Sequence, residues 1–114
     1  VCMAVISALM EKRARHALRV LSKYARIRAA YIFGSQTTGT ADTWSDIDLA
    51  VFLDGLETWT LPQRARTAAL IQKEAGDDIE LHFFPARGMD ELPPASFAAF
   101  VVDHGVSVSP EETA

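Results

Sequence analysis

The chain has 114 residues, of which 49% are hydrophobic and 23% are charged, and its formal net charge is −4. This length suits one domain covering 1–114, and the acidic balance does not favour direct binding of nucleic acid, because neutralised phosphates supply most non-specific affinity. The single cysteine excludes an internal disulfide, and no apolar run reaches the roughly 20 residues that span a bilayer, so we expect a cytoplasmic protein without a membrane segment.

The first predicted element is a long helix over 3–27, in a stretch that is rich in Ala, Leu, Arg and Lys and contains no Gly or Pro. Its basic residues recur at steps of three and four, and they are Lys12, Arg15, Arg19, Lys23 and Arg26. Such a stripe is typical of a solvated helix face. A surface for a triphosphate or an acidic partner is the alternative interpretation.

Strands and helices alternate along the rest of the chain. An apolar run predicts a strand over 29–33, and Ser35 can cap a short helix or turn through about residue 38. Further strands are expected over 46–53 and 78–84, a helix over 61–75 between them, a short helix over 95–103 and a small edge strand over 106–108. The resulting α-β-α-β-α-β-α order predicts an α/β (α+β) protein with one small mixed sheet and helices packed on it.

The clearest chemical pattern lies between the first two predicted strands. Gly34 and Ser35 are followed by ten residues and then by Asp46-Ile47-Asp48. Side chains alternate along a strand, so the two aspartates point to one face and Ile47 to the other. Paired carboxylates can hold divalent cations, and a Gly-Ser turn offers backbone N–H groups and a hydroxyl to a phosphate. The pattern therefore indicates metal and phosphate chemistry.

Three polar side chains share one face of the third predicted strand. They are Asp78, Glu80 and His82, while Ile79, Leu81 and Phe83 occupy the other face. His82 can reach a site on the face that it shares with Glu80. A structural or exposed role is nevertheless our preferred interpretation of this histidine.

A longer stretch around the two aspartates carries a family resemblance. It runs from Phe33-Gly34-Ser35 through Gly39-Thr40-Ala41 to Ser45-Asp46-Ile47-Asp48-Leu49. This stretch of sequence resembles the polymerase-β-like nucleotidyltransferase superfamily and looks most like its minimal nucleotidyltransferases. The similarity is strongest over 31–52 and continues more loosely to about residue 84. It implies the palm-like sheet of that superfamily and a reaction that moves a nucleotide from a triphosphate.

The resemblance implies that three carboxylates form a catalytic metal site. Asp46 and Asp48 would bind two Mg²⁺ ions, with Asp48 bridging both. Glu80 would be the third ligand and the candidate general base for the acceptor hydroxyl, at a place where relatives typically carry Asp. Asp78 is the reserve candidate for that role.

The resemblance also implies how ATP, the usual nucleotide of this family, is held. Gly34 and Ser35 would cradle its β- and γ-phosphates, because glycine permits close approach of the backbone and the hydroxyl donates a hydrogen bond. Gln36 follows them and completes the expected nucleotide-binding segment. Many relatives carry Arg at this place, so this segment lacks one cationic contact that the family would provide.

Minimal nucleotidyltransferases are commonly paired with a HEPN-family ribonuclease toxin, to which they transfer AMP on a tyrosine hydroxyl. The resemblance implies this antitoxin function here, with the acceptor held by a partner or a second subunit.

One alternative is transfer to a small hydroxylated molecule, as in aminoglycoside nucleotidyltransferases, which would require a pocket shared within a homo-oligomer. The other is a non-catalytic antitoxin that blocks its toxin by contact. The set of three carboxylates argues against it, because a steric inhibitor has no need for acids on one face.

Overall fold

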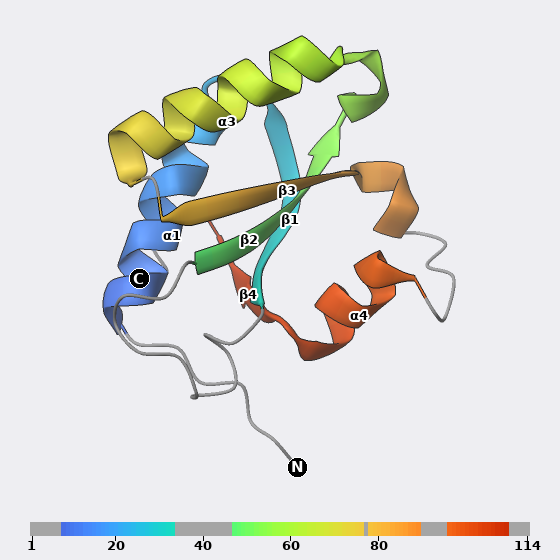
Figure 1. Ribbon diagram of the computed structural model, residues 1–114. Coiled ribbons are helices and arrows are strands. Elements are labelled where there is room, and N and C mark those ends of the chain that lie inside the picture. Colours follow the sequence, from blue (N-terminus) through green and yellow to red (C-terminus); the bar gives the residue numbers. More distant parts are fainter. Residues whose placement is uncertain (1–7, 34–46, 77, 90–95, 110–114) are drawn as a thin grey trace.

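The computed structural model describes residues 8–33, 47–76, 78–89 and 96–109, and Figure 1 shows their arrangement. The helices are α1 (Ala8–Leu21), α3 (Leu61–Ala75) and α4 (Phe97–His104), and the strands are β1 (Arg26–Phe33), β2 (Ile47–Asp54), β3 (Ile79–Pro85) and β4 (Val106–Val108). Short 3-10 turns occupy Leu56–Thr58 and Ala86–Met89. None of the described helices is long and apolar enough to cross a membrane.

The strands form one mixed sheet in the order β3-β2-β1-β4. β1 runs antiparallel to β2 and to β4, whereas β2 and β3 are parallel. A parallel pair needs a long crossover connection, and α3 lies in the one that joins β2 to β3. This architecture confirms the predicted α/β (α+β) class with a small mixed sheet.

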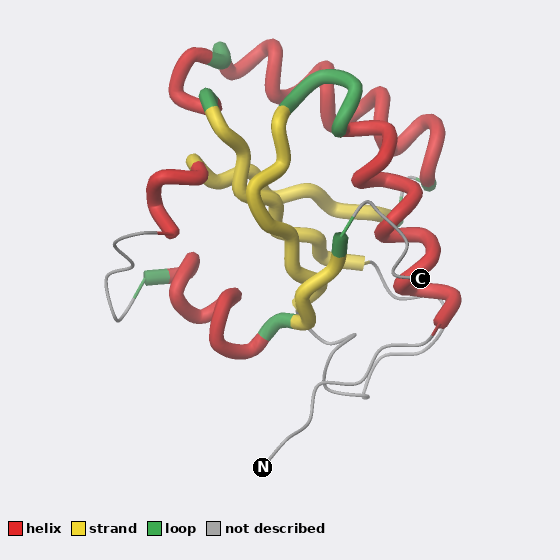
Figure 2. Tube along the Cα trace, turned by 180° about the vertical axis from the view of Figure 1, so that it is seen from behind, coloured by secondary structure: helices red, strands yellow, loops and turns green. Residues whose placement is uncertain are grey.

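The two faces of the sheet are covered by different helices. α1 and α3 lie together on one face and α4 lies on the other, as Figure 1 and the reverse view in Figure 2 show. The main hydrophobic core lies under α1 and α3, where alternate strand residues pack against both helices: Ala30, Ile32, Ile47, Leu49, Val51, Leu53 and Ile79. Because side chains alternate along a strand, the residues between them face α4 and the solvent.

Helix α3 begins and ends where the sequence predicts. The Thr60 hydroxyl accepts a hydrogen bond from the backbone N–H of Gln63 (3.2 Å), and Pro62 stands in the first turn, where no N–H is required. Gly76 ends the helix with a positive φ of 128°, a conformation that favours glycine. The prediction of a helix over 61–75 is therefore confirmed at both ends.

The N-terminal helix is shorter than predicted. α1 ends at Leu21 and β1 begins at Arg26, so the prediction that the helix continues to residue 27 is wrong, as is a first strand that starts at residue 29. Ser22 donates a hydrogen bond from its hydroxyl to the carbonyl oxygen of Arg19 (2.7 Å), and a turn over 22–24 follows. Pairing between Arg26 and Asp54 of β2 outweighs the helical propensity of this stretch.

The predicted basic stripe shortens with the helix. Lys12, Arg15 and Arg19 stay on α1, and Arg15 pairs with Glu11 one turn earlier (2.6 Å). The bounds of the later strands and helices agree with the predictions to within two residues. The predicted helix start over 3–7 and the turn that follows Ser35 lie outside the described residues.

Candidate active site

The sheet face opposite α1 and α3 brings the candidate catalytic residues into register. Asp48 on β2 lies beside Phe33 of β1 on one side and Glu80 of β3 on the other. Two positions further along β2, Ala50 lies beside His82 of β3. The parallel register of β2 and β3 therefore places two carboxylates next to each other and an imidazole diagonally behind them.

Asp48, Glu80 and His82 form a compact group of possible metal ligands. Each offers one ligand atom, and these atoms lie within 4.8 Å of one another. His82 Nε2 is 3.5 Å from Asp48 Oδ1, and the side chains of His82 and Asp48 are 30% and 26% exposed, so solvent still reaches them. Two carboxylate oxygens and an unsatisfied ring nitrogen form a donor set that fits a divalent cation after small side-chain rotations.

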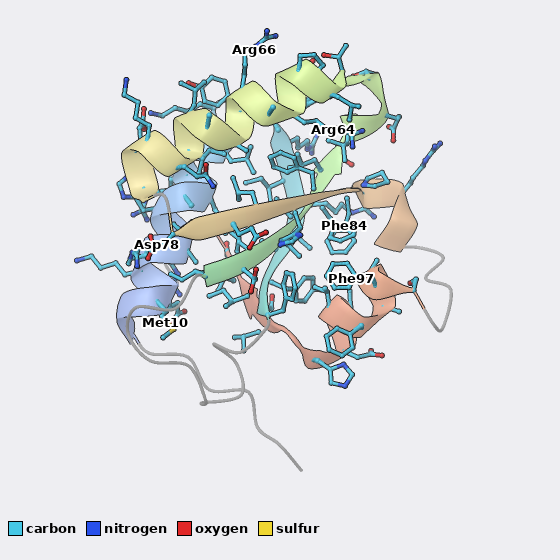
Figure 3. All side chains as sticks on the ribbon, in the orientation of Figure 1. Met10, Arg64, Arg66, Asp78, Phe84 and Phe97 are labelled. Atoms are coloured by element: carbon cyan, nitrogen blue, oxygen red, sulfur yellow. The ribbon has the colours of Figure 1, made fainter. Side chains whose placement is uncertain are left out.

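Aromatic rings hold His82 in place. The imidazole packs edge-on against Phe33 (ring centroids 5.1 Å apart) and against Phe97 of α4 (6.1 Å). Phe97 also contacts Phe33 (5.4 Å) and Phe84 (5.9 Å), and Figure 3 shows Phe97 and Phe84 meeting where α4 approaches the sheet. Helix α4 thus closes one side of the candidate site with the aromatic ring of Phe97.

Asp78, the reserve candidate for the general base, was predicted to share a face with Glu80 and His82, and that prediction is wrong, because its side chain turns to α1 on the other side of the sheet. Its carboxylate forms a hydrogen-bonded ion pair with Arg13 of α1, and Figure 3 shows it at the α1 end of β3. The hydrogen bond from Arg13 lowers the pKa of Asp78; partial burial opposes this shift, and the positive charge of Arg13 adds to it. The same hydrogen bond raises the pKa of Arg13. Asp78 therefore joins α1 to β3, and the choice between the two acids on this strand favours Glu80.

Several predicted site residues lie outside the described residues. They are Gly34, Ser35, Gln36 and Asp46. The flanking positions are described: Phe33, the last residue of β1, pairs with Asp48, and the N–H of Ile47 donates to the carbonyl oxygen of Asp78 (2.8 Å). The roles of the undescribed residues in phosphate and metal binding stay predictions.

His82 is the residue that sequence reasoning underrated. Its position two residues after Glu80 placed it on the correct face, and the helix predicted between the two strands is what a parallel pair requires, but the sequence did not show the register that brings the imidazole to Asp48. That pairing sets His82 beside Ala50, whose small side chain leaves the imidazole room to lean towards Asp48. The only available signal was the spacing of Glu80 and His82 along the strand.

Comparisons with known proteins identify the family. The family model described as Polymerase beta, Nucleotidyltransferase matches residues 16–91, which is more than half of the chain and spans β1, β2, α3 and β3. No curated protein matches the chain by sequence. The matched segment includes Gly34 and Ser35, both aspartates of the Asp-x-Asp pattern and strand β3 with Glu80. The chain has the α/β fold of the polymerase-β-like nucleotidyltransferases and belongs to that family.

Proposed function

We propose that this protein is a metal-dependent adenylyltransferase that moves AMP from ATP to a tyrosine hydroxyl of a HEPN-family toxin, and so acts as its antitoxin. Family membership supports nucleotidyl transfer in general. The proposal of ATP, of Mg²⁺ and of a toxin acceptor rests on the resemblance of the stretch around Gly34 to Leu49 to the minimal nucleotidyltransferases.

One observation carries the catalytic part of the proposal. Asp48 and Glu80 lie side by side on parallel strands, on a sheet face that α1 and α3 leave uncovered. Two partly or fully exposed carboxylates at one register position repel each other, so their juxtaposition is an unfavourable arrangement without a cation. This repulsion between Asp48 and Glu80 is expected if the two acids serve a reaction and do not serve the stability of the fold.

The proposed reaction forms one bond and breaks one. The acceptor hydroxyl oxygen attacks the α-phosphorus of ATP, an O–P bond forms, and the bond from that phosphorus to pyrophosphate breaks. Glu80, which is exposed on β3, accepts the proton of the hydroxyl. Asp48 and Glu80 would hold the divalent cations, which when bound offset the negative charge that develops on the phosphates.

The test uses ATP labelled at the α-phosphate, a divalent cation and the purified HEPN-family protein of the same organism. The wild type is compared with Asp48→Asn and Glu80→Gln, which keep side-chain size and remove the charge. Asp54→Asn is the matched control, because Asp54 is an exposed acid on the same face of β2, at its far end. We expect label on a toxin tyrosine with the wild type and Asp54→Asn, and its loss with the two site variants.

Other outcomes would replace parts of the proposal. Label on a small hydroxylated molecule instead of the toxin would favour the small-molecule transferase. No label with any nucleoside triphosphate, together with toxin neutralisation that survives Asp48→Asn, would favour the non-catalytic antitoxin. Equal labelling by wild type and Asp48→Asn would show that the cluster on β2 and β3 is not the catalytic site.

A further inference from the structure

One polar atom of the candidate site has no hydrogen-bond partner among the described residues. It is Nε2 of His82, which is buried although the side chain as a whole is 30% exposed. Asp48 Oδ1 is 3.5 Å away, which is too long for an effective hydrogen bond. A buried ring nitrogen without a partner is unfavourable, so its position calls for a physical explanation.

The two tautomers of the imidazole lead to the same conclusion. A proton on Nε2, whether the ring is neutral or doubly protonated, would have Asp48 Oδ1 at an N···O separation of 3.5 Å, which is too far for an effective hydrogen bond. A proton on Nδ1 would leave the Nε2 lone pair directed at the carboxylates of Asp48 and Glu80, which is repulsive. A cation between the three groups removes the repulsion and satisfies the nitrogen, and the three ligand atoms already lie within 4.8 Å of one another.

The surroundings of His82 favour a fixed imidazole over a mobile one. Phe33 and Phe97 pack against two sides of the ring. Ala50, its neighbour across the β2–β3 ladder, is small and fully buried, so the ring can lean towards Asp48. A preorganised ligand loses little side-chain freedom when an ion binds.

We propose that His82 is a third protein ligand at this site, binding through Nε2 the cation that Asp48 and Glu80 hold. The inference rests on the proposed function, because it uses the same metal site. Mg²⁺ prefers oxygen ligands, whereas Mn²⁺, which also suits carboxylates, binds imidazole nitrogen more readily than Mg²⁺ does, and the later divalent transition ions bind it more strongly still. His82 therefore raises the affinity of the site for a divalent transition ion such as Mn²⁺ more than it raises the affinity for Mg²⁺, the ion that the resemblance implies.

Binding of Mn²⁺ to the metal-free, full-length protein tests the inference without reference to activity. The concentration of free Mn²⁺ is followed by its electron paramagnetic resonance signal, and Mg²⁺ affinity is obtained by competition. His82→Phe keeps an aromatic ring between Phe33 and Phe97 but removes both nitrogens. We expect it to weaken Mn²⁺ binding at least about tenfold, because losing even a hydrogen-bond partner of a metal ligand costs about that much, and to change Mg²⁺ binding much less.

Pulsed electron paramagnetic resonance of bound Mn²⁺ separates a ligand from a positioning residue. Direct coordination by His82 gives a ¹⁴N modulation that the wild type shows and His82→Phe loses. His16→Gln is the control, because His16 is exposed on α1 and should leave both affinity and modulation unchanged. Circular dichroism verifies that each variant is folded.

Three results would overturn the inference: a wild type without nitrogen modulation, unchanged Mn²⁺ affinity in His82→Phe, or equal losses of Mn²⁺ and Mg²⁺ affinity. Asp48→Asn distinguishes this failure from failure of the proposed function. If Asp48→Asn abolishes metal binding while His82→Phe has no effect, only the role of His82 is lost. If neither variant affects binding, the metal site itself lies elsewhere.

Discussion

The two faces of strand β2 obey different physical demands within one stretch of eight residues. Ile47, Leu49, Val51 and Leu53 are at most 1% exposed and pack under α1 and α3. Asp48, which alternates with them, is 26% exposed and meets Glu80 and His82 on the other face. Burial on the core face, and of Ala50 and Phe52 on the opposite face, fixes the strand in place, and Asp48 at the start of the strand uses that rigid position to bring its carboxylate close to Glu80 and His82.

This comparison predicts the largest effect for Asp48→Asn. Removing the charge of the residue central to the metal cluster should reduce the rate of nucleotidyl transfer about 10³-fold, because several kcal/mol of transition-state stabilisation depend on it. The free energy of unfolding should change little, since Asp48 is partly exposed and does not belong to the core. Single-turnover kinetics and urea unfolding on the same sample test both parts, and a variant that transfers at the wild-type rate would contradict the assignment.

Leu49, the residue after Asp48, should show the opposite pattern, in which a substitution lowers stability but leaves metal binding intact. Leu49→Ala removes a fully buried side chain from the core between the sheet and the helices, so we expect a loss of about 2–5 kcal/mol in the free energy of unfolding. The metal affinity of the molecules that remain folded should stay near the wild-type value. Thermal unfolding and Mn²⁺ titration at low temperature measure the two effects. A loss of metal binding without a loss of stability would contradict the assignment of stability to the Leu49 face of β2 and of metal binding to the Asp48 face.

A smaller effect is expected at Gly76, between α3 and β3. Its φ is 128°, and a Cβ there would lie 2.6 Å from Arg13 Nη2 and 2.7 Å from Asp78 Oδ1. Gly76→Ala should therefore cost about 1–3 kcal/mol of stability through backbone strain and displacement of the ion pair. Gly55→Ala is a useful comparison, because Gly55 also has a positive φ (78°) but open space around its Cβ position. The Gly76 variant should unfold at the lower urea concentration of the two.

The smallest effect concerns pH and the ion pair between Arg13 and Asp78. The lowered pKa of Asp78 means that the pair stabilises the fold above the unfolded carboxyl pKa of about 3.9 and that this contribution is lost as pH falls through the lower, folded value. Because both side chains are about 30% exposed, we expect at most about 1 kcal/mol.

Urea unfolding of the wild type and Arg13→Met between pH 6 and pH 2.5 measures this contribution. The wild type should be the more stable protein at pH 6, and the two curves should converge in acid. Lys12→Met, an exposed neighbour on α1, controls for the loss of one positive charge. A difference between wild type and Arg13→Met that grows as pH falls would contradict the sign of the shift.

The sequence correctly predicted those features of the fold that depend only on residues close together in the chain, such as the ends of α3. Thr60, Pro62 and Gly76 bracket α3 with a cap, a tolerated proline and a positive-φ glycine, and each acts within a few residues of its position. The alternation of Ile47, Asp48 and Leu49 likewise assigned each side chain to a face of β2, because the period of a strand is a local property. The spacing of Gly34-Ser35 and Asp46-Ile47-Asp48 then pointed to the family that comparison confirmed.

Long-range contacts decided the rest. The end of α1 at Leu21 depends on the pairing of β1 with β2. A prediction from helical propensity alone therefore made the helix too long. The ion pair between Arg13 and Asp78 joins residues 65 positions apart, and it explains why Asp78 points away from the metal cluster. The position of His82 beside Asp48 depends on the parallel register of β2 and β3, with the packing of Phe97 from α4 behind it. Sequence alone determined the residue types and, within β2 and from Ile79 onwards in β3, the faces of the strands, because these depend on local periodicity; it misplaced Asp78, which precedes β3. Only the tertiary structure decided which acids and which histidine meet, because that depends on how distant strands pair.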